Sequence, residues 1–197
     1  MRVISGKFKG QKILTPQSSL TRPTQDRVKE SLFQLLEHRG YLENSAILDL
    51  FAGSGALAIE SLSRGALSAD LIDKSSEANK VIKANVRNLK IMGYVHLWQK
   101  DADVYLSQIG KMQNKQYDVI FIDPPYDFSD EKIFQIVKKI NDSKLLKTQE
   151  GERGIIVIER DSRSLVDVLL SRINQIKNIE KKRYSDTSVF LVDFDNE

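Results

Sequence analysis

The sequence contains no cysteine and only two histidines, His38 and His96. Without thiols there is no disulfide, no thiolate–metal site and no cysteine nucleophile, and two histidines do not favour a histidine-based metal site, so we expect no metal. No apolar run is long enough to span a bilayer, and the first residues lack the apolar segment of a signal peptide. We therefore expect a cytoplasmic protein with no membrane partner.

Basic residues are concentrated at the start of a chain that is otherwise ordinary in composition. The 197 residues are 41% hydrophobic and 29% charged, which suits one globular domain. Residues 1–30 hold seven basic and two acidic residues, a net charge of +5, whereas the whole chain carries +3. This asymmetry indicates an anionic partner such as nucleic acid, although a solvated basic surface explains the charge equally well.

Hydrophobic periodicity predicts alternating strands and helices after an N-terminal extension. Residues 2–15 read as paired strands around Gly6 and Gly10, and residues 22–38 as a helix with Thr24 as its N-cap. The predicted strands are 46–51, 69–73, 95–99, 118–123 and 154–159. The predicted helices are 55–64, 75–92, one from about 101, 131–140 and 164–173. A hairpin is expected from 179–186 and 187–194. Repeated β-α-β units imply a mostly parallel sheet with helices on both faces.

Polar or glycine-rich motifs follow four successive predicted strands. In open α/β sheets, ligands bind beyond the carboxyl ends of the strands, so these motifs should meet. They are Asp49 with Gly53-Ser54-Gly55 after the first strand, Asp73 at the end of the second, Asp101-Ala102 after the third, and Asp123-Pro124-Pro125-Tyr126 at the end of the fourth. Four motifs at four strand ends favour a ligand site over glycines that only turn the chain.

The segment from Gly53 to Ala58 also fits the dinucleotide-binding pattern G-x-G-x-x-A, which would indicate a nicotinamide-dependent dehydrogenase. Asp49 weakens that reading, because a carboxylate four residues before the first glycine would repel a pyrophosphate. An acid in this position can instead pair with an amino group of a ligand.

S-adenosylmethionine fits the four motifs together. Asp49 and the glycine loop suit its amino acid end, Asp73 its ribose hydroxyls and Asp101 its adenine. The cofactor has no phosphate, and residues 49–56 contain no lysine or arginine. The predicted cofactor contacts are Asp49, Phe51, Ala52, Gly53, Ser54, Gly55, Asp73, Lys74, Asp101 and Ala102.

The turn Asp123-Pro124-Pro125-Tyr126 suits methyl transfer to an exocyclic amine. A carboxylate and a rigid proline carbonyl can hold both N–H groups of the amine in line with the methyl donor, and Tyr126 can stack on the base, a contact worth roughly 1–3 kcal/mol. With an ordinary pKa near 3.9, Asp123 would orient the amine rather than act as a strong base. An acceptor-only carboxylate also suits the adjacent N1–H and amine of guanine somewhat better than adenine.

Several longer stretches carry a resemblance to a known family. The segment "LDLFAGSGALAIESLSRGA" and the "DPPY" turn look like the amino-methyltransferases of the seven-stranded S-adenosylmethionine fold. Together with "RVISGKFKGQKI", "RPTQDRVKESLF" and "KRYSDTSVFLVDF", they resemble the bacterial small-subunit (16S) rRNA guanine-N2 methyltransferase family over nearly the whole chain. The sequence departs from the family at Ser61, where alanine is usual, and at Ser185, where glycine is usual.

The resemblance implies a Rossmann-like methyltransferase domain over residues 41–197 and an RNA-facing hairpin and helix over residues 1–40, in one compact unit. It also implies S-adenosylmethionine-dependent methylation of a guanine N2 in 16S rRNA of the small ribosomal subunit. Asp123, Pro124, Pro125 and Tyr126 are then the catalytic residues. The expected RNA contacts are Arg2, Lys7, Lys9, Lys12, Arg22, Thr24 and Arg27.

Two alternatives stay open at this point. An adenine-N6 DNA methyltransferase can carry the same turn, but the chain has no evident room for a target-recognition domain. A non-catalytic RNA-binding assembly factor could keep only the fold, but the intact Asp123-Pro124-Pro125-Tyr126 turn argues against it.

Overall fold

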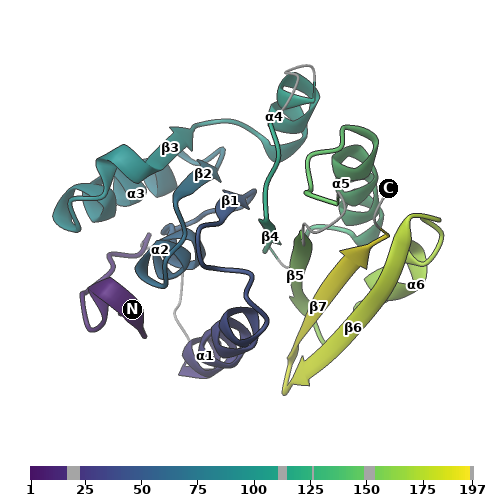
Figure 1. Ribbon diagram of the computed structural model, residues 1–197, viewed down its shortest axis with the longest axis horizontal. Coiled ribbons are helices and arrows are strands. Elements are labelled where there is room, and N and C mark those ends of the chain that lie inside the picture. Colours follow the sequence, from purple (N-terminus) through teal and green to yellow (C-terminus); the bar gives the residue numbers. More distant parts are fainter. Residues whose placement is uncertain (17–22, 111–114, 126, 149–153, 196–197) are drawn as a thin grey trace.

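Seven strands form one sheet in the order β3-β2-β1-β4-β5-β7-β6 (Figure 1). The computed structural model describes residues 1–16, 23–110, 115–125, 127–148 and 154–195. The first five strands run parallel, and β7 pairs antiparallel with β6, as the predicted C-terminal hairpin requires. β7 also pairs antiparallel with β5. The strands are β1 Ala46–Asp49, β2 Ser68–Ile72, β3 Val95–Trp98, β4 Val119–Ile122, β5 Ile155–Asp161, β6 Ile176–Tyr184 and β7 Thr187–Phe194.

Helices cover both faces of this sheet (Figure 1). One face carries α1, α2 and α3, and the other carries α4, α5 and α6. Within the described ranges, no helix is long and apolar enough to cross a bilayer. The helices are α1 Pro23–His38, α2 Ala56–Ser63, α3 Ser76–Asn88, α4 Ala102–Ile109, α5 Asp130–Asp142 and α6 Val166–Leu170, with 3₁₀ turns η1 Gly6–Phe8 and η2 Met92–Tyr94.

The central strands send alternate side chains into two separate cores. In β4, Val119 and Phe121 pack with α1, α2 and α3, whereas Ile120 and Ile122 pack with α4, α5 and α6. All four residues are buried, which explains why β4 reads as a continuous apolar run rather than an alternating one. The rigid sheet therefore fixes the positions at which its strands end.

The start of the chain differs from the predicted pair of strands. Residues 1–13 do pair antiparallel, but only Arg2 and Lys12 form a bridge, and η1 occupies the turn. Gly6 has a φ of +77°, and a Cβ there would lie 1.9 Å from the Ser63 carbonyl oxygen. The turn therefore packs closely on α2, and the segment does not form the longer hairpin predicted from the sequence. The N-cap prediction for Thr24 was wrong, because α1 begins at Pro23, where a fixed φ and a missing N–H suit the first turn.

A buried carboxylate holds this N-terminal segment against α2. Glu60 is fully buried and accepts hydrogen bonds from the backbone N–H groups of Ile4 at 2.8 Å and Ser5 at 3.0 Å. Arg64 pairs with the same carboxylate at 2.9 Å, and the Nζ of the buried Lys29 lies 3.9 Å from it. The segment is thus fixed on the face that carries α1, α2 and α3.

Candidate active site

The predicted strand-end motifs meet around one cavity of about 670 Å³. It lies at the carboxyl ends of the parallel strands, beside the start of α4. The predicted residues that line it are Phe51, Gly53, Asp73, Lys74, Asp101, Ala102, Asp123, Pro124 and Pro125. Four others, Asp49, Ala52, Ser54 and Gly55, are not among its lining residues, and Tyr126 lies outside the described residues.

Asp73 shapes the glycine loop through its carboxylate. Its Oδ2 accepts a hydrogen bond from the Gly53 N–H at 2.8 Å, and its Oδ1 accepts one from the Ser75 N–H at 2.8 Å. Gly53 and Gly55 have φ values of +53° and +79°, which glycine adopts without strain. A Cβ at Gly55 would lie 3.0 Å from a methyl group of Leu71, so the loop also needs glycine for its close approach to β2.

Asp49 is a buried carboxyl group with an unused oxygen. It is 1% exposed, and no group in the described part of the chain bonds to its Oδ2. Its Oδ1 accepts only a long hydrogen bond of 3.4 Å from the Phe51 N–H. Burial, reinforced by the negative charges of Asp123 and Asp73, raises the pKa of Asp49 to about 8. A cationic group brought close to this carboxyl would favour its ionised form.

Two further acids share the same environment. Asp123 is accessible from the cavity, yet reduced solvation raises its pKa to about 6, against the opposing charge of Arg160. Burial, with the nearby charge of Asp123, also raises the pKa of Glu159 well above its usual value. With Asp49 and Asp73, these acids favour a cationic ligand and disfavour a pyrophosphate.

S-adenosylmethionine fits this donor set, because it carries a sulfonium and an ammonium group. The unpartnered Asp49 oxygen suits the ammonium group, and the glycine loop leaves room for backbone to approach the ligand. Two features argue against a nicotinamide-dependent dehydrogenase. The acid cluster would repel a pyrophosphate, and the sheet contains the antiparallel strand β7, which a dinucleotide-binding sheet of order 3-2-1-4-5-6 lacks.

Arg160 holds the turn that follows β4. It is 8% exposed and donates hydrogen bonds to the carbonyl oxygens of Pro125, at 3.4 Å, and Phe128. Its Nε also pairs with Asp130 at 3.3 Å. The Phe128 N–H donates to the Pro125 carbonyl at 2.9 Å, so this carbonyl is already engaged. The turn is therefore fixed from β5, and the remaining proline carbonyl next to Asp123 is that of Pro124.

Some residues that line the cavity were not predicted from the sequence. Glu159 and Arg160 lie near the carboxyl end of β5, and the same strand-end rule could have found them. Phe128 stacks edge-on against Phe51, with ring centroids 5.2 Å apart, but no sequence signal joins two aromatic residues so far apart. The other missed residues are Leu50, Lys100, Asp127 and Lys132.

Asp101 has a structural role beside its predicted one. As the N-cap of α4, its Oδ1 accepts a hydrogen bond from the Asp103 N–H at 2.9 Å. The side chain is nevertheless exposed and lines the cavity, so a contact with adenine remains a prediction.

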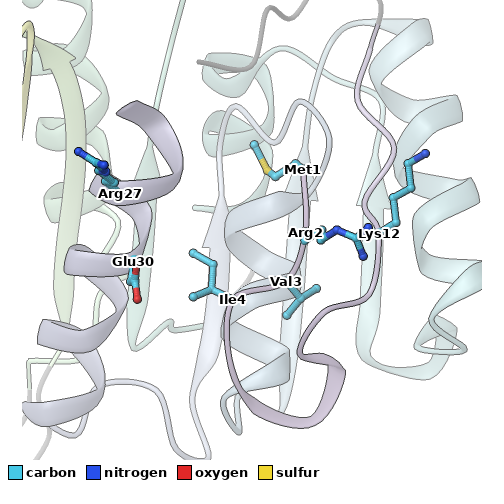
Figure 2. Close-up of a pocket in the computed structure, with 7 residues that line it drawn as sticks. All are labelled: Met1, Arg2, Val3, Ile4, Lys12, Arg27 and Glu30. Carbon is cyan, nitrogen blue, oxygen red and sulfur yellow. The ribbon is translucent and has the colours of Figure 1, made fainter. Parts of the chain in front are cut away.

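The predicted RNA contacts divide into two groups (Figure 2). Arg2 and Lys12 lie on the N-terminal segment and Arg27 lies on α1, around a second cavity of about 490 Å³. Lys7 and Lys9 are exposed at η1 and do not line this cavity. Arg22 and the side chain of Thr24 lie outside the described part of the structure.

Comparison with known proteins gives concordant matches. The family described as "Conserved hypothetical protein 95" matches residues 1–193. "Putative rRNA methyltransferase YlbH" of Bacillus subtilis is 36% identical over 82% of this chain and 83% of that protein. "Ribosomal RNA small subunit methyltransferase D" of Buchnera aphidicola is 40% identical over 63% of this chain and 62% of its own length. The structure of "Putative methyltransferase yhhF" from Escherichia coli is 25% identical, with a TM-score of 0.80 over 100% of this chain and 99% of that one.

Proposed function

Since the chain belongs to the family described as Conserved hypothetical protein 95, we propose that it transfers a methyl group to the exocyclic N2 amine of a guanine in 16S rRNA. Its sheet has the strand order of the seven-stranded methyltransferase fold. We assign S-adenosylmethionine as its cofactor, because the unpartnered Asp49 oxygen and the acidic cavity suit a ligand with an ammonium and a sulfonium group. The name of the Buchnera relative, which includes the small ribosomal subunit, supports the choice of RNA.

One observation carries the proposal. The Asp123 carboxyl opens onto the same cavity as Phe51, Gly53 and Asp73, within a turn that Arg160 fixes from β5. A target base held at Asp123 would therefore lie beside the proposed cofactor contacts. Such fixed proximity is a large part of the rate enhancement in group transfer.

We assign the orientation of the amine to Asp123 and Pro124. The Asp123 carboxylate can accept from the guanine N1–H and from one amine N–H, and the Pro124 carbonyl can accept the other amine N–H. S-adenosylmethionine supplies an electrophilic methyl group on a sulfonium. Because the Pro125 carbonyl is engaged with Phe128 and Arg160, it is not part of this assignment.

The raised pKa of Asp123 changes its expected role. With the ordinary pKa expected from the sequence alone, Asp123 would be a poor proton acceptor. A pKa of about 6 makes it a better one, since it lies closer to the operating pH. We therefore assign to an Asp123 oxygen the proton that the amine must lose as it gains the methyl group.

The direct test is methyl transfer to small ribosomal subunits taken from cells that lack this protein. We expect one new N2-methylguanine in 16S rRNA, located by mass mapping after incubation with purified protein and S-adenosylmethionine. Transfer to adenine in duplex DNA instead would support the alternative DNA methyltransferase. Binding of RNA with no transfer to any substrate would support the non-catalytic assembly factor.

Variants of Tyr126 test the stacking role predicted from the sequence. Tyr126→Phe keeps the ring and should stay active, whereas Tyr126→Ala should weaken capture of the flipped-out base. If both variants lose activity equally, the hydroxyl matters and the stacking role is wrong.

A further inference from the structure

The side chain of Asn85 joins the N-terminal segment to the glycine loop after β1. Asn85 lies on α3 and is 1% exposed. Its Oδ1 accepts a hydrogen bond from the Leu14 N–H at 2.8 Å, and its Nδ2 donates to the Leu14 carbonyl at 2.9 Å. The same Nδ2 donates to the Ser54 carbonyl at 2.9 Å, so both amide donors are used.

The two segments joined by Asn85 belong to different proposed sites. Ser54 lies between the two glycines of the loop, and the N–H of Gly53 is bonded to Asp73 at the cofactor cavity. Leu14 lies two residues after Lys12, which lines the second cavity, shown in Figure 2. Because the Asn85 amide is buried, a break in either link leaves polar groups without a partner, which costs free energy.

Other anchors hold the N-terminal segment without reaching the glycine loop. Glu60 binds the N–H groups of Ile4 and Ser5. The Ser63 hydroxyl accepts from the Phe8 N–H at 2.9 Å and donates to the Ser5 carbonyl. Asn85 is therefore not needed merely to attach the segment, and among these anchors it alone also contacts the loop.

We infer that Asn85 is a positioning residue that couples the two sites, so that cofactor and RNA strengthen each other's binding. This inference rests on the proposed function, because RNA is the ligand assigned to the N-terminal segment. A cofactor that restrains the motion of the glycine loop also restrains Ser54 and, through the Asn85 hydrogen bonds, Leu14. RNA therefore loses less conformational entropy when it binds this segment, and its affinity rises. Because coupling between two sites is reciprocal, RNA raises the affinity for the cofactor by the same factor.

The coupling is measurable as a ratio of affinities. The dissociation constant of small-subunit 16S rRNA is determined with and without saturating S-adenosylhomocysteine. We expect a tightening of about fivefold or more in the wild type, as is typical of coupled sites. We expect a ratio near one in Asn85→Ala, whereas Ser63→Ala keeps the wild-type ratio even if its RNA affinity falls. A ratio near one in the wild type, or an unchanged ratio in Asn85→Ala, overturns the inference.

Hydrogen exchange tests the same link without RNA and so separates it from the proposed function. S-adenosylhomocysteine should slow exchange of the Leu14 amide in the wild type but not in Asn85→Ala. Exchange of the amides of residues 53–55 should slow in both proteins. Asn85→Ser, which is too short to bridge both segments, serves as a second variant if Asn85→Ala does not fold. Equal protection of Leu14 in wild type and variant contradicts the coupling, whatever the RNA substrate is.

Discussion

Replacing Asp49 with asparagine should reduce the stability that the unliganded protein loses as the pH rises from 5 to 8. The pKa of Asp49 is raised from 3.8 to about 8 in the folded protein. A carboxyl group with a raised folded-state pKa contributes stability that is present at low pH and lost as pH rises toward that pKa. Between pH 4 and pH 8 the unfolded chain releases this proton, whereas the folded protein keeps it.

The size of the effect follows from the shift. Each pH unit in this window costs about 1.4 kcal/mol, so the loss from pH 5 to pH 8 is on the order of 4 kcal/mol. Domains of this kind are commonly stable by about 5–15 kcal/mol, so such a change is readily measured. Asparagine has no proton to release, so the free energy of unfolding of Asp49→Asn should lack this contribution to the pH dependence.

Urea unfolding of both proteins at pH 5 and pH 8 is the assay. Asp123 and Glu159 also have raised pKa values, so the difference between wild type and Asp49→Asn isolates Asp49. The wild type should lose more stability than Asp49→Asn between the two pH values. If the two proteins lose the same amount, Asp49 ionises normally and our account of its burial is wrong.

The same substitution should impair cofactor binding. S-adenosylhomocysteine keeps the ammonium group that we assign to Asp49 but lacks the sulfonium. Its affinity for the wild type should rise with pH up to about 8, by as much as about tenfold per unit, because binding requires the ionised carboxylate. Asp49→Asn should bind more weakly with a flatter pH dependence, which calorimetry at several pH values would show.

Three further predictions concern other parts of the chain. Asp123→Asn should lower the rate of methyl transfer about 10²-fold or more, with cofactor affinity nearly unchanged. In the wild type, turnover should decrease as the pH is lowered past about 6, because Asp123 becomes protonated. Replacing Lys12 and Arg27 with glutamine should reduce the slope of the logarithm of RNA affinity against the logarithm of salt concentration by about one unit per lost phosphate contact. An unchanged slope would show that these residues are solvated and do not contact RNA. Ser185→Gly should raise the free energy of unfolding by up to about 1 kcal/mol, because Ser185 has a φ of +54° in the two-residue turn between β6 and β7; a decrease would show that this turn is not strained.

Much of the fold was predictable because its signals are local. Buried strands such as β4 are continuous apolar runs, and α3 begins where Ser75 caps it by accepting from the Ala78 N–H. The parallel sheet then brings strand ends together, so Asp73 and Asp123 could be placed at one cavity from their positions in sequence alone.

What the sequence did not predict depends on contacts between distant segments. The pKa of Asp49 follows from its complete burial, which no neighbouring residue reveals. The three hydrogen bonds of Asn85 connect it to residues far along the chain, and an asparagine within a helix gives no hint of them. The N-terminal segment was read as a longer hairpin because its fit against Ser63 cannot be seen in its own pattern.

The place of β7 in the sheet has a consequence for how the protein folds. β7 is the last strand in sequence, yet it lies between β5 and β6, and Ile158 pairs with Phe190. Until β7 is synthesised and docks, β5 presents an unpaired edge whose first four residues, Ile155–Ile158, are apolar, and such an edge can template aggregation. Completion of the sheet therefore waits for a non-local pairing, which is intrinsically slow. We expect a chain truncated before β7 to aggregate through β5 rather than to form a smaller, functional methyltransferase domain.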